Sequence, residues 1–230
     1  MNFRSIPLVT KNILVITVIA FLATNLLQNR VDLTNLLGLH YFQAPAFKPY
    51  QFVTYIFMHG SFMHILFNML AVFMFGAVLE NVWGPKRFLM FYIFTGLGAA
   101  LTQLVVYYFQ ITPKLEYLDM ILSQAKTYQE QSQVLEVKKE LLNSYVIVGA
   151  SGSLFGLLIA FGIMFPNAEL MMLFLPIPIK AKYFVAIYGG IELFSGLANN
   201  PEDNVAHFAH LGGMLFGFIL TMIWRRKYRY

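Results

Sequence analysis

Apolar residues dominate six stretches of the 230-residue chain, and polar residues separate these stretches instead of alternating with them. Most stretches approach the roughly 20 residues that a helix needs to cross the hydrocarbon core of a bilayer. The pattern therefore predicts an all-α membrane protein with six transmembrane helices in one bundle. The expected spans cover residues 13–28, 60–79, 87–110, 146–165, 183–198 and 205–224.

Two connecting segments differ from the expected spans. Residues 111–145 are the one soluble-looking stretch, and we expect an outward polar insertion that contains an exposed amphipathic helix. Residues 168–179, "AELMMLFLPIPI", are apolar but short and carry Pro176 and Pro178. Such a segment suits a connection in the membrane interface better than a crossing.

Composition supports the membrane class, because only 12% of the residues are charged and 58% are hydrophobic, against about 25% charged in an ordinary soluble domain. The chain has no cysteine, which excludes a disulfide framework and a thiolate metal site. Arg4 and Lys11 precede the first apolar run, but no small-x-small cleavage site follows it. We expect an uncleaved first span and a single domain over residues 1–230.

Basic residues are distributed unevenly between the two sides of the expected bundle. The side that carries both termini has ten basic and two acidic residues, whereas the other side has six basic and eight acidic residues. The positive-inside rule then places both termini in the cytoplasm. This topology explains the net charge of +5 without a nucleic acid partner, and the terminal "RRKYR" suits contact with anionic lipid headgroups.

Four polar side chains share one depth, one to two turns below the outer surface of the expected bundle. His64 and Asn68 are four residues apart on the second span, Ser151 lies on the fourth and His210 on the sixth. Polar groups inside a membrane indicate a functional site by default. His59 and His207, nearer the outer ends of their spans, fit either a structural or a functional role.

Paired glycines predict how two of these helices meet. Gly152 and Gly156 form a GxxxG pattern on the fourth span, and Gly213 and Gly217 form another on the sixth. Small residues at this spacing allow helix backbones to pack directly. We therefore expect Ser151 and the histidine of the sixth span to reach hydrogen-bond distance.

A serine needs a base to become a nucleophile, and His210 is the candidate base. Asn68, His64 and the backbone N–H of Ser151 could stabilise an oxyanion, and Phe155 could stack on the imidazole of His210. Glu202 and Asp203 lie in an outer loop, so no carboxylate is expected at this depth and a Ser–His dyad is predicted. Glu192, in the fifth span, is expected to join helices through a protonated or hydrogen-bonded carboxyl group.

Three motifs, "HGSFMHILFNM", "GASG" and "AHFAHLGGMLFG", resemble in order those of the rhomboid intramembrane serine proteases, and the resemblance covers residues 13–224. It implies a rhomboid-like bundle that cleaves single-span or multi-span membrane proteins within or next to their transmembrane helices, without metal or cofactor. It also implies a bacterial inner membrane location, with the active site open to the outer side. The implied nucleophile is Ser151 and the base His210, with His64 and Asn68 at the oxyanion hole and Phe155, Gly149, Gly152, Gly213 and Gly217 in support.

Two features depart from the rhomboid pattern. The Trp-Arg pair that many rhomboids carry in the first outer loop is absent from residues 29–59, so the bracing of this loop is open. The insertion at 111–145 is longer than in compact bacterial members. Ser153 also argues against the nucleophile elbow of an α/β-hydrolase, which needs glycine at that position and a preceding strand.

Two other function classes stay open. A catalytically silent relative would bind transmembrane helices, but it would be expected to lack the serine or the histidine. A metal transporter could use four histidines as ligands, although this leaves Ser151 and the paired glycines unexplained. The four candidate ligands are His59, His64, His207 and His210.

Overall fold

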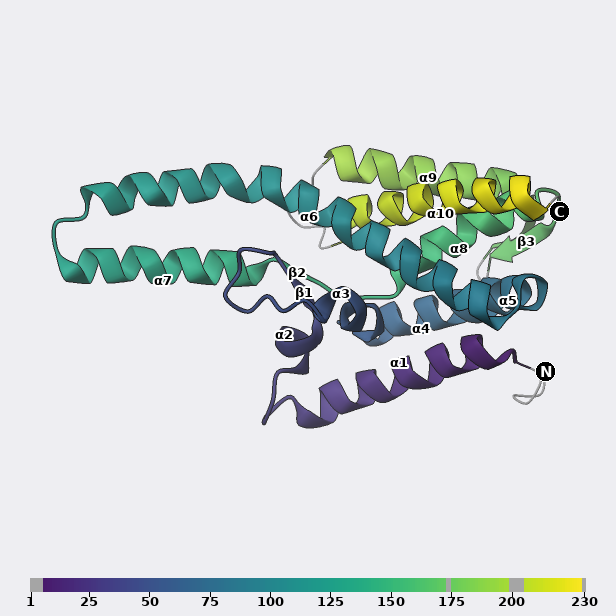
Figure 1. Cartoon of the computed structure of the whole chain (residues 1–230), viewed down its shortest axis with the longest axis horizontal. Helices are drawn as coiled ribbons and strands as arrows, with labels where there is room; N and C mark the ends of the chain where they lie inside the picture. The colour runs from purple at the N-terminus through teal and green to yellow at the C-terminus, as the bar shows by residue number, and fades with distance from the viewer. Residues whose placement is uncertain (1–5, 173–174, 199–204, 229–230) are drawn as a thin grey trace.

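A computed structural model describes residues 6–172, 175–198 and 205–228 of the chain. Its helices lie side by side in a bundle, from which one helical hairpin projects (Figure 1). Helix α1 begins and α10 ends at the same end of the bundle, and the hairpin projects from the other end (Figure 1). The described part of the chain therefore begins and ends on the same side of the bundle (Figure 1).

The elements follow one another with short connections in most of the described chain. The helices are α1 (Leu8–Leu27), α2 (Leu33–Leu37), α3 (Gln51–Thr54), η2 (Tyr55–Phe57), α4 (Phe62–Ala71), the π-helical η3 (Val72–Gly76), α5 (Ala77–Trp83), α6 (Pro85–Gln124), α7 (Tyr128–Ser144), α8 (Ser151–Met164), α9 (Ala181–Ala198) and α10 (His207–Tyr228). The strands are β1 (Leu39–His40), β2 (Val146–Ile147), β3 (Glu169–Met172) and β4 (Leu175–Lys180).

Four described helices are long and apolar enough to cross a membrane, namely α1, the continuous rod Phe62–Trp83, α6 and α10. Helix α8 is apolar but has only 14 residues. Helix α9 has 18 residues and is not among the four. The helical membrane class is confirmed, whereas the count of six crossings stays a prediction.

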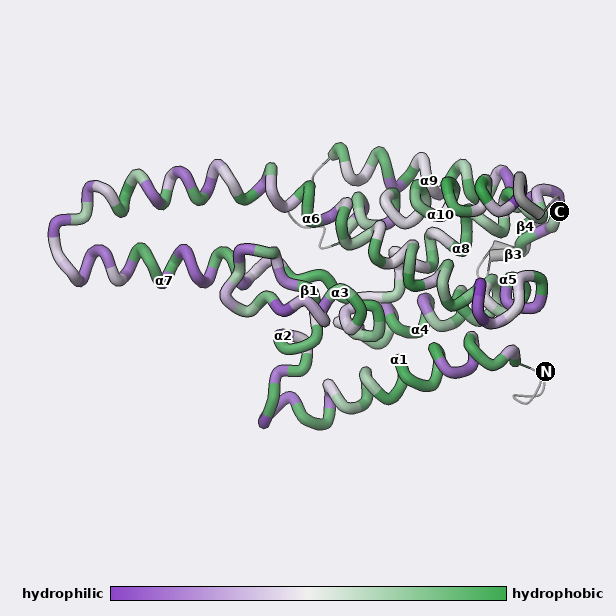
Figure 2. Tube along the Cα trace, in the orientation of Figure 1, coloured by the Kyte–Doolittle hydropathy of each residue, from purple (hydrophilic) through white to green (hydrophobic). Residues whose placement is uncertain are grey.

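The insertion at residues 111–145 contains the expected exposed helix, α7, as one arm of a helical hairpin. Helix α6 continues past its expected end, through Pro113 to Gln124, and α7 returns beside it. A capping box starts α7, since the Oγ1 of Thr127 accepts from the N–H of Glu130 while the Glu130 carboxylate accepts from the N–H of Thr127. Polar and apolar positions mix along the hairpin, in contrast to the bundle (Figure 2).

The two pairs of short strands depart from the all-α expectation. Strands β3 and β4 form an antiparallel hairpin within the segment expected to be an interfacial connection, and they pair Glu169 with Lys180. Strands β1 and β2 pair Leu39 with Ile147, so the first outer loop is joined to the segment that leads into α8.

A buried glutamine braces the first outer loop, in which the Trp-Arg pair is missing. The side-chain oxygen of Gln51 accepts from the N–H groups of His40 and Lys48, at 3.3 and 3.0 Å. Its side-chain nitrogen donates to the carbonyl oxygens of Leu36 and Ala46, at 3.2 and 3.0 Å. One amide thus satisfies four backbone groups and holds β1 against α3.

Three central helices, α6, α8 and α10, pack through glycines. A Cβ atom added at Gly98 of α6 would overlap the ring of Phe216 on α10, and one added at Gly152 of α8 would overlap the side chain of Ala99 on α6. These close contacts place the beginning of α8 beside α10, where the candidate site lies.

Candidate active site

Helix α8 begins at Ser151, five residues after the expected start of the fourth span. The preceding residues leave the helix because Val146 and Ile147 pair with β1. Gly149 then has φ of +124°, a conformation that a residue with a Cβ rarely adopts. Its N–H donates to the carbonyl oxygen of Tyr55 at 3.0 Å. Ser151 therefore occupies the first helical position, where backbone N–H groups have no intrahelical acceptor.

The glycine pairs bring α8 and α10 into backbone contact, as their spacing predicts. A Cβ atom added at Gly213 would overlap the carbonyl oxygen of Gly152. One added at Gly217 would lie 2.8 Å from the Cα atom of Gly156. No side chain larger than hydrogen fits between these helices at those two levels.

The close approach of α8 and α10 puts a hydroxyl and an imidazole in contact. The Oγ atom of Ser151 lies 2.8 Å from the Nε2 atom of His210, which is 8% exposed. The ring of Phe155, one helical turn after Ser151, stacks on the imidazole with centroids 4.3 Å apart and planes at 10°. The stack limits rotation of the imidazole, so its Nε2 stays directed at the hydroxyl.

A carboxylate completes this arrangement, which corrects the expectation that none lies at the depth of Ser151. The Oε2 atom of Glu192 on α9 is 2.8 Å from the Nδ1 atom of His210. The same oxygen is 2.6 Å from the Nδ1 atom of His207. The structure thus contains a Ser–His–Glu chain of contacts where a Ser–His pair was predicted, and His207 joins it.

Hydrogen-bond chemistry assigns the protons in this chain. An ionised carboxylate only accepts, so the Nδ1 atom of His210 must carry the hydrogen that it donates to Glu192. In the neutral ring, Nε2 is then the acceptor and takes the hydrogen bond of the Ser151 hydroxyl. This tautomer is the one that a general base requires.

A second pair of histidines and an asparagine lie at the other side of the nucleophile. The Nδ2 atom of Asn68 is 3.0 Å from the Nε2 atom of His59, and the His59 and His64 rings are 4.8 Å apart in an edge-to-face arrangement. A Cβ atom added at Gly149 would come within 2.8 Å of the His64 ring. His64 therefore borders the turn that leads into Ser151, whereas Asn68 bonds to the neighbouring His59.

His59 is held neutral in this position. Burial first, and the neighbouring His64 second, lower the pKa of its ring to about 4, although a hydrogen bond to the carbonyl oxygen of Phe57 partly opposes the shift. The neutral ring donates from Nδ1 to that carbonyl and accepts from Asn68 at Nε2. His59 thereby orients the Asn68 amide.

The family model described as Rhomboid domain matches residues 46–227, well over half of the chain. The chain belongs to the rhomboid family. It is 29% identical over 178 residues to "Putative rhomboid protease YdcA" of Bacillus subtilis, a match that covers 77% of this chain and 68% of that protein.

Two further relatives come from other lineages. The match to "Rhomboid protein 1, mitochondrial" of Saccharomyces cerevisiae is 27% identical and covers 71% of this chain and 38% of that protein. The match to "Rhomboid protease AarA" of Providencia stuartii is 25% identical and covers 72% of this chain and 52% of that protein. This rhomboid thus matches only about a third to a half of the length of these two relatives.

Ser153, the second hydroxyl of the "GASGSLFG" stretch, is remote from this chemistry. Its Oγ atom donates to the carbonyl oxygen of Tyr92 on α6 at 2.8 Å, and the side chain is buried. It joins α8 to α6 and does not contact the imidazole of the rhomboid site in any described bond. Ser151 and Ser153 therefore differ in their surroundings although the sequence places them only two residues apart.

The four histidines of the metal-transporter hypothesis do not form one cluster. Among the residues that the structure describes, the one group of three or more metal-capable ligand atoms within 4.8 Å of one another belongs to Glu192, His207 and His210. His59 instead bonds to Asn68. The histidines of this rhomboid are thus divided between two sides of Ser151.

Sequence reasoning missed the placement of Glu192 and the role of His59. The signal for Glu192 was present, since a carboxyl group within an apolar helix requires a partner and the next helix carries two histidines. His59 lies nine residues before Asn68, and a non-helical turn separates the two. Helical periodicity therefore gives no indication that their side chains meet.

Proposed function

We propose that this rhomboid is an intramembrane serine endopeptidase, with Ser151 as nucleophile and His210 as general base. The observation that carries the proposal is the 2.8 Å contact between the Oγ atom of Ser151 and the Nε2 atom of His210. Two helices that touch through glycine hold these atoms, so the contact is built into the backbone packing.

The contact supports acyl transfer. His210 takes the hydroxyl proton at Nε2 while the Ser151 oxygen bonds to the carbonyl carbon of the scissile peptide. The resulting imidazolium returns the proton to the leaving nitrogen as the C–N bond breaks, which leaves an acyl-serine. A water then gives a proton to His210 as its oxygen attacks the ester carbonyl, and the imidazolium returns that proton to the Ser151 oxygen as the ester C–O bond breaks and the new carboxyl terminus leaves.

The oxyanion formed in each step needs donors. The N–H of Ser151 stands at the N-terminus of α8, where unpaired N–H groups and the helix dipole favour negative charge. Asn68 donates one amide hydrogen to His59, and its second amide hydrogen is the donor that we assign to the oxyanion. His64 borders the same turn and is the third proposed donor.

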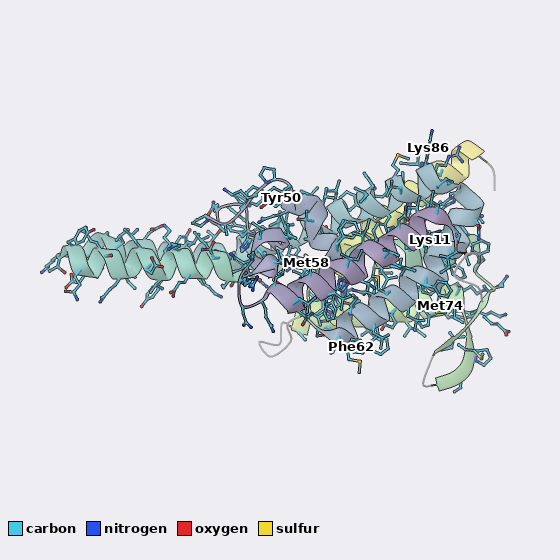
Figure 3. The ribbon with its side chains drawn as sticks, turned by 90° about the horizontal axis from the view of Figure 1, so that it is seen from below. Lys11, Tyr50, Met58, Phe62, Met74 and Lys86 are labelled. Carbon is cyan, nitrogen blue, oxygen red and sulfur yellow. The ribbon has the colours of Figure 1, made fainter. Side chains whose placement is uncertain are left out.

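The proposed substrates are single-span or multi-span membrane proteins in a lipid bilayer, cleaved within or next to a transmembrane helix. Lys11 and Lys86 lie toward the end of the bundle opposite the hairpin (Figure 3). Together with the basic residues near the C-terminus, they support cytoplasmic termini and a site open to the outer side of a bacterial inner membrane.

The alternative is a catalytically silent rhomboid that binds transmembrane helices. The aligned hydroxyl and imidazole favour catalysis, because helix binding alone does not require an Oγ–Nε2 contact. A serine-directed fluorophosphonate probe separates the two. We expect labelling of the wild type and loss of labelling in Ser151→Ala and His210→Ala.

Ser153→Ala is the matched control for that experiment. It removes a hydroxyl two residues away that bonds to Tyr92, so labelling should persist. Cleavage of a single-span protein in liposomes, with the cut mapped by mass spectrometry, should follow the same pattern. A wild type that does not label, or Ser151→Ala that labels equally, contradicts the protease proposal.

A further inference from the structure

We propose that Glu192 is a positioning residue of this site, which fixes the orientation and tautomer of His210 from a different helix. The inference rests on the proposed protease function and extends the predicted dyad to three residues. It is carried by the 2.8 Å contact between the Oε2 atom of Glu192 and the Nδ1 atom of His210.

Helix α9 directs its one buried acid inward. The buried residues of α9 are Ala181, Val185 and Glu192, which share one helical face at spacings of four and seven. Ile191 and Leu193, on either side of the acid, are about half exposed, whereas Glu192 is 7% exposed. The exposed face of α9 is apolar, whereas its carboxyl group meets the two histidines of α10.

The contact is selective in the atom that it uses. A carboxyl group that only joined α9 to α10 could bond to any donor on α10. Glu192 instead accepts from the Nδ1 atom of the ring whose Nε2 atom contacts Ser151. Fixing a hydrogen on Nδ1 leaves Nε2 free of hydrogen, which is the state in which His210 accepts the serine proton.

His207 holds the carboxylate in this position. Its Nδ1 atom is 2.6 Å from the same Oε2 atom, so one oxygen receives two imidazole N–H groups. An unpaired carboxylate among apolar side chains is costly, and two charge-assisted hydrogen bonds offset that cost. His207 therefore acts through Glu192 and does not contact Ser151 in any described bond.

Glu192 also bears on the charge that develops in the reaction. When His210 takes the serine proton, its ring becomes an imidazolium, with the new hydrogen on Nε2 and the original hydrogen still on Nδ1. The carboxylate keeps its negative charge and attracts the ring, and no proton passes to Glu192. Because this contact joins α9 to α10, catalysis depends on the packing of α9 against α10.

Steady-state cleavage of a single-span substrate tests the kinetic consequence. We expect Glu192→Ala to lower kcat by roughly 100- to 10,000-fold, on the scale of carboxylate loss in serine protease triads, with little change in KM. Glu192→Gln keeps an oxygen acceptor but removes the charge, and we expect a smaller loss of kcat. If Glu192→Ala fails to fold, Glu192→Gln, which is close in shape, decides the kinetic test.

Matched controls separate positioning from folding. Glu169→Gln removes an exposed carboxylate on β3, beyond the far end of α8, and should leave kcat unchanged. His207→Gln removes the second donor to Glu192, and we expect a loss of kcat smaller than that of Glu192→Ala. Equal kcat in the wild type, Glu192→Ala and Glu192→Gln would overturn the proposal and leave Ser151 and His210 in place.

Nitrogen-15 NMR of labelled histidine gives a readout that does not require activity. In the Ser151→Ala background, His210 should carry hydrogen on Nδ1 when Glu192 is present and a mixture of tautomers in Glu192→Ala. An unchanged tautomer after the loss of Glu192 overturns positioning. If the wild type does not label with fluorophosphonate, the protease function fails, and the tautomer experiment still decides whether Glu192 positions His210.

Discussion

The Nδ2 atom of Asn68 lies 3.0 Å from the Nε2 atom of His59, two groups that the chain separates by a non-helical turn and the start of α4. A neutral imidazole is the acceptor in this bond, because both residues would otherwise present hydrogens. The bond leaves the Asn68 amide one further hydrogen, directed by a ring that is itself tied to the backbone at Phe57. Asn68 is thus oriented before any substrate arrives.

Loss of this oriented amide should lower turnover. We expect Asn68→Ala to reduce kcat by roughly 10- to 1,000-fold, since one oxyanion donor contributes about that much. Asn25→Ala is the control, because Asn25 is exposed on α1 and bonds only within its own helix in the described structure. Kinetics on a single-span substrate in liposomes check this, and wild-type turnover in Asn68→Ala would remove Asn68 from the oxyanion site.

His59 should make the fold sensitive to acid. Above about pH 6.5 the ring is neutral both when folded and when unfolded, so it has no effect on the pH dependence. Burial lowers the pKa in the folded protein to about 4, so as pH falls from 6.5 to 4 the unfolded chain takes up the proton first and stability is lost. The total loss is at most about 3 kcal/mol.

Thermal unfolding in detergent between pH 7 and pH 4 measures this loss. The melting temperature of the wild type should fall more steeply than that of His59→Gln, which cannot titrate at this position. Comparison with the variant separates the contribution of His59 to the pH dependence of stability from the contributions of the other acid-sensitive groups. Parallel curves for the two proteins would show that His59 does not link protonation to unfolding.

The contact of α8 and α10 predicts that substitution by alanine lowers activity at one glycine and leaves it unchanged at another. Gly213→Ala places a methyl group on the carbonyl oxygen of Gly152, so the helices must separate and Ser151 must move from His210. We expect a lower melting temperature and a loss of turnover of 100-fold or more, as for a displacement of about 1 Å. Gly190→Ala is the control, because a Cβ atom there meets nothing within 4 Å. Equal activity in the two variants would contradict this account.

Motif spacing predicted the contacts within and between nearby helices well. The GxxxG pairs indicate which faces of α8 and α10 meet, although α8 begins five residues later than the expected span. Phe155 could be assigned from its position one turn after Ser151. These inferences succeed because they depend on helical periodicity, which a single sequence displays.

Helical periodicity does not predict the pairing of strands that lie far apart in the sequence, the full length of a helix, or the packing of one helix on another. Val146 and Ile147 read as the start of an apolar span, but pairing with Leu39 and His40 makes them a strand. The hydropathy pattern predicts that the third span ends at residue 110, because hydropathy indicates only which residues suit a lipid environment. The helix itself continues into the hairpin. Glu192 lies six residues, about 9 Å, before the end of α9, and only the packing of α9 on α10 shows which side chain it meets.

Glu80 anchors the first helix of the rhomboid and gives a prediction on stability alone. Its carboxylate accepts from the N–H groups of Val9 and Thr10, at 2.9 and 2.7 Å, and from the Thr10 hydroxyl at 2.8 Å. Glu80→Ala leaves these donors unpaired at a buried helix N-terminus, so we expect a loss of about 3 kcal/mol. Thr10→Val removes only the hydroxyl and should cost about 1 kcal/mol. Thermal unfolding in detergent and hydrogen exchange at Val9 and Thr10 measure both effects, and equal melting temperatures for the wild type and Glu80→Ala would show that α1 is held by its apolar face alone.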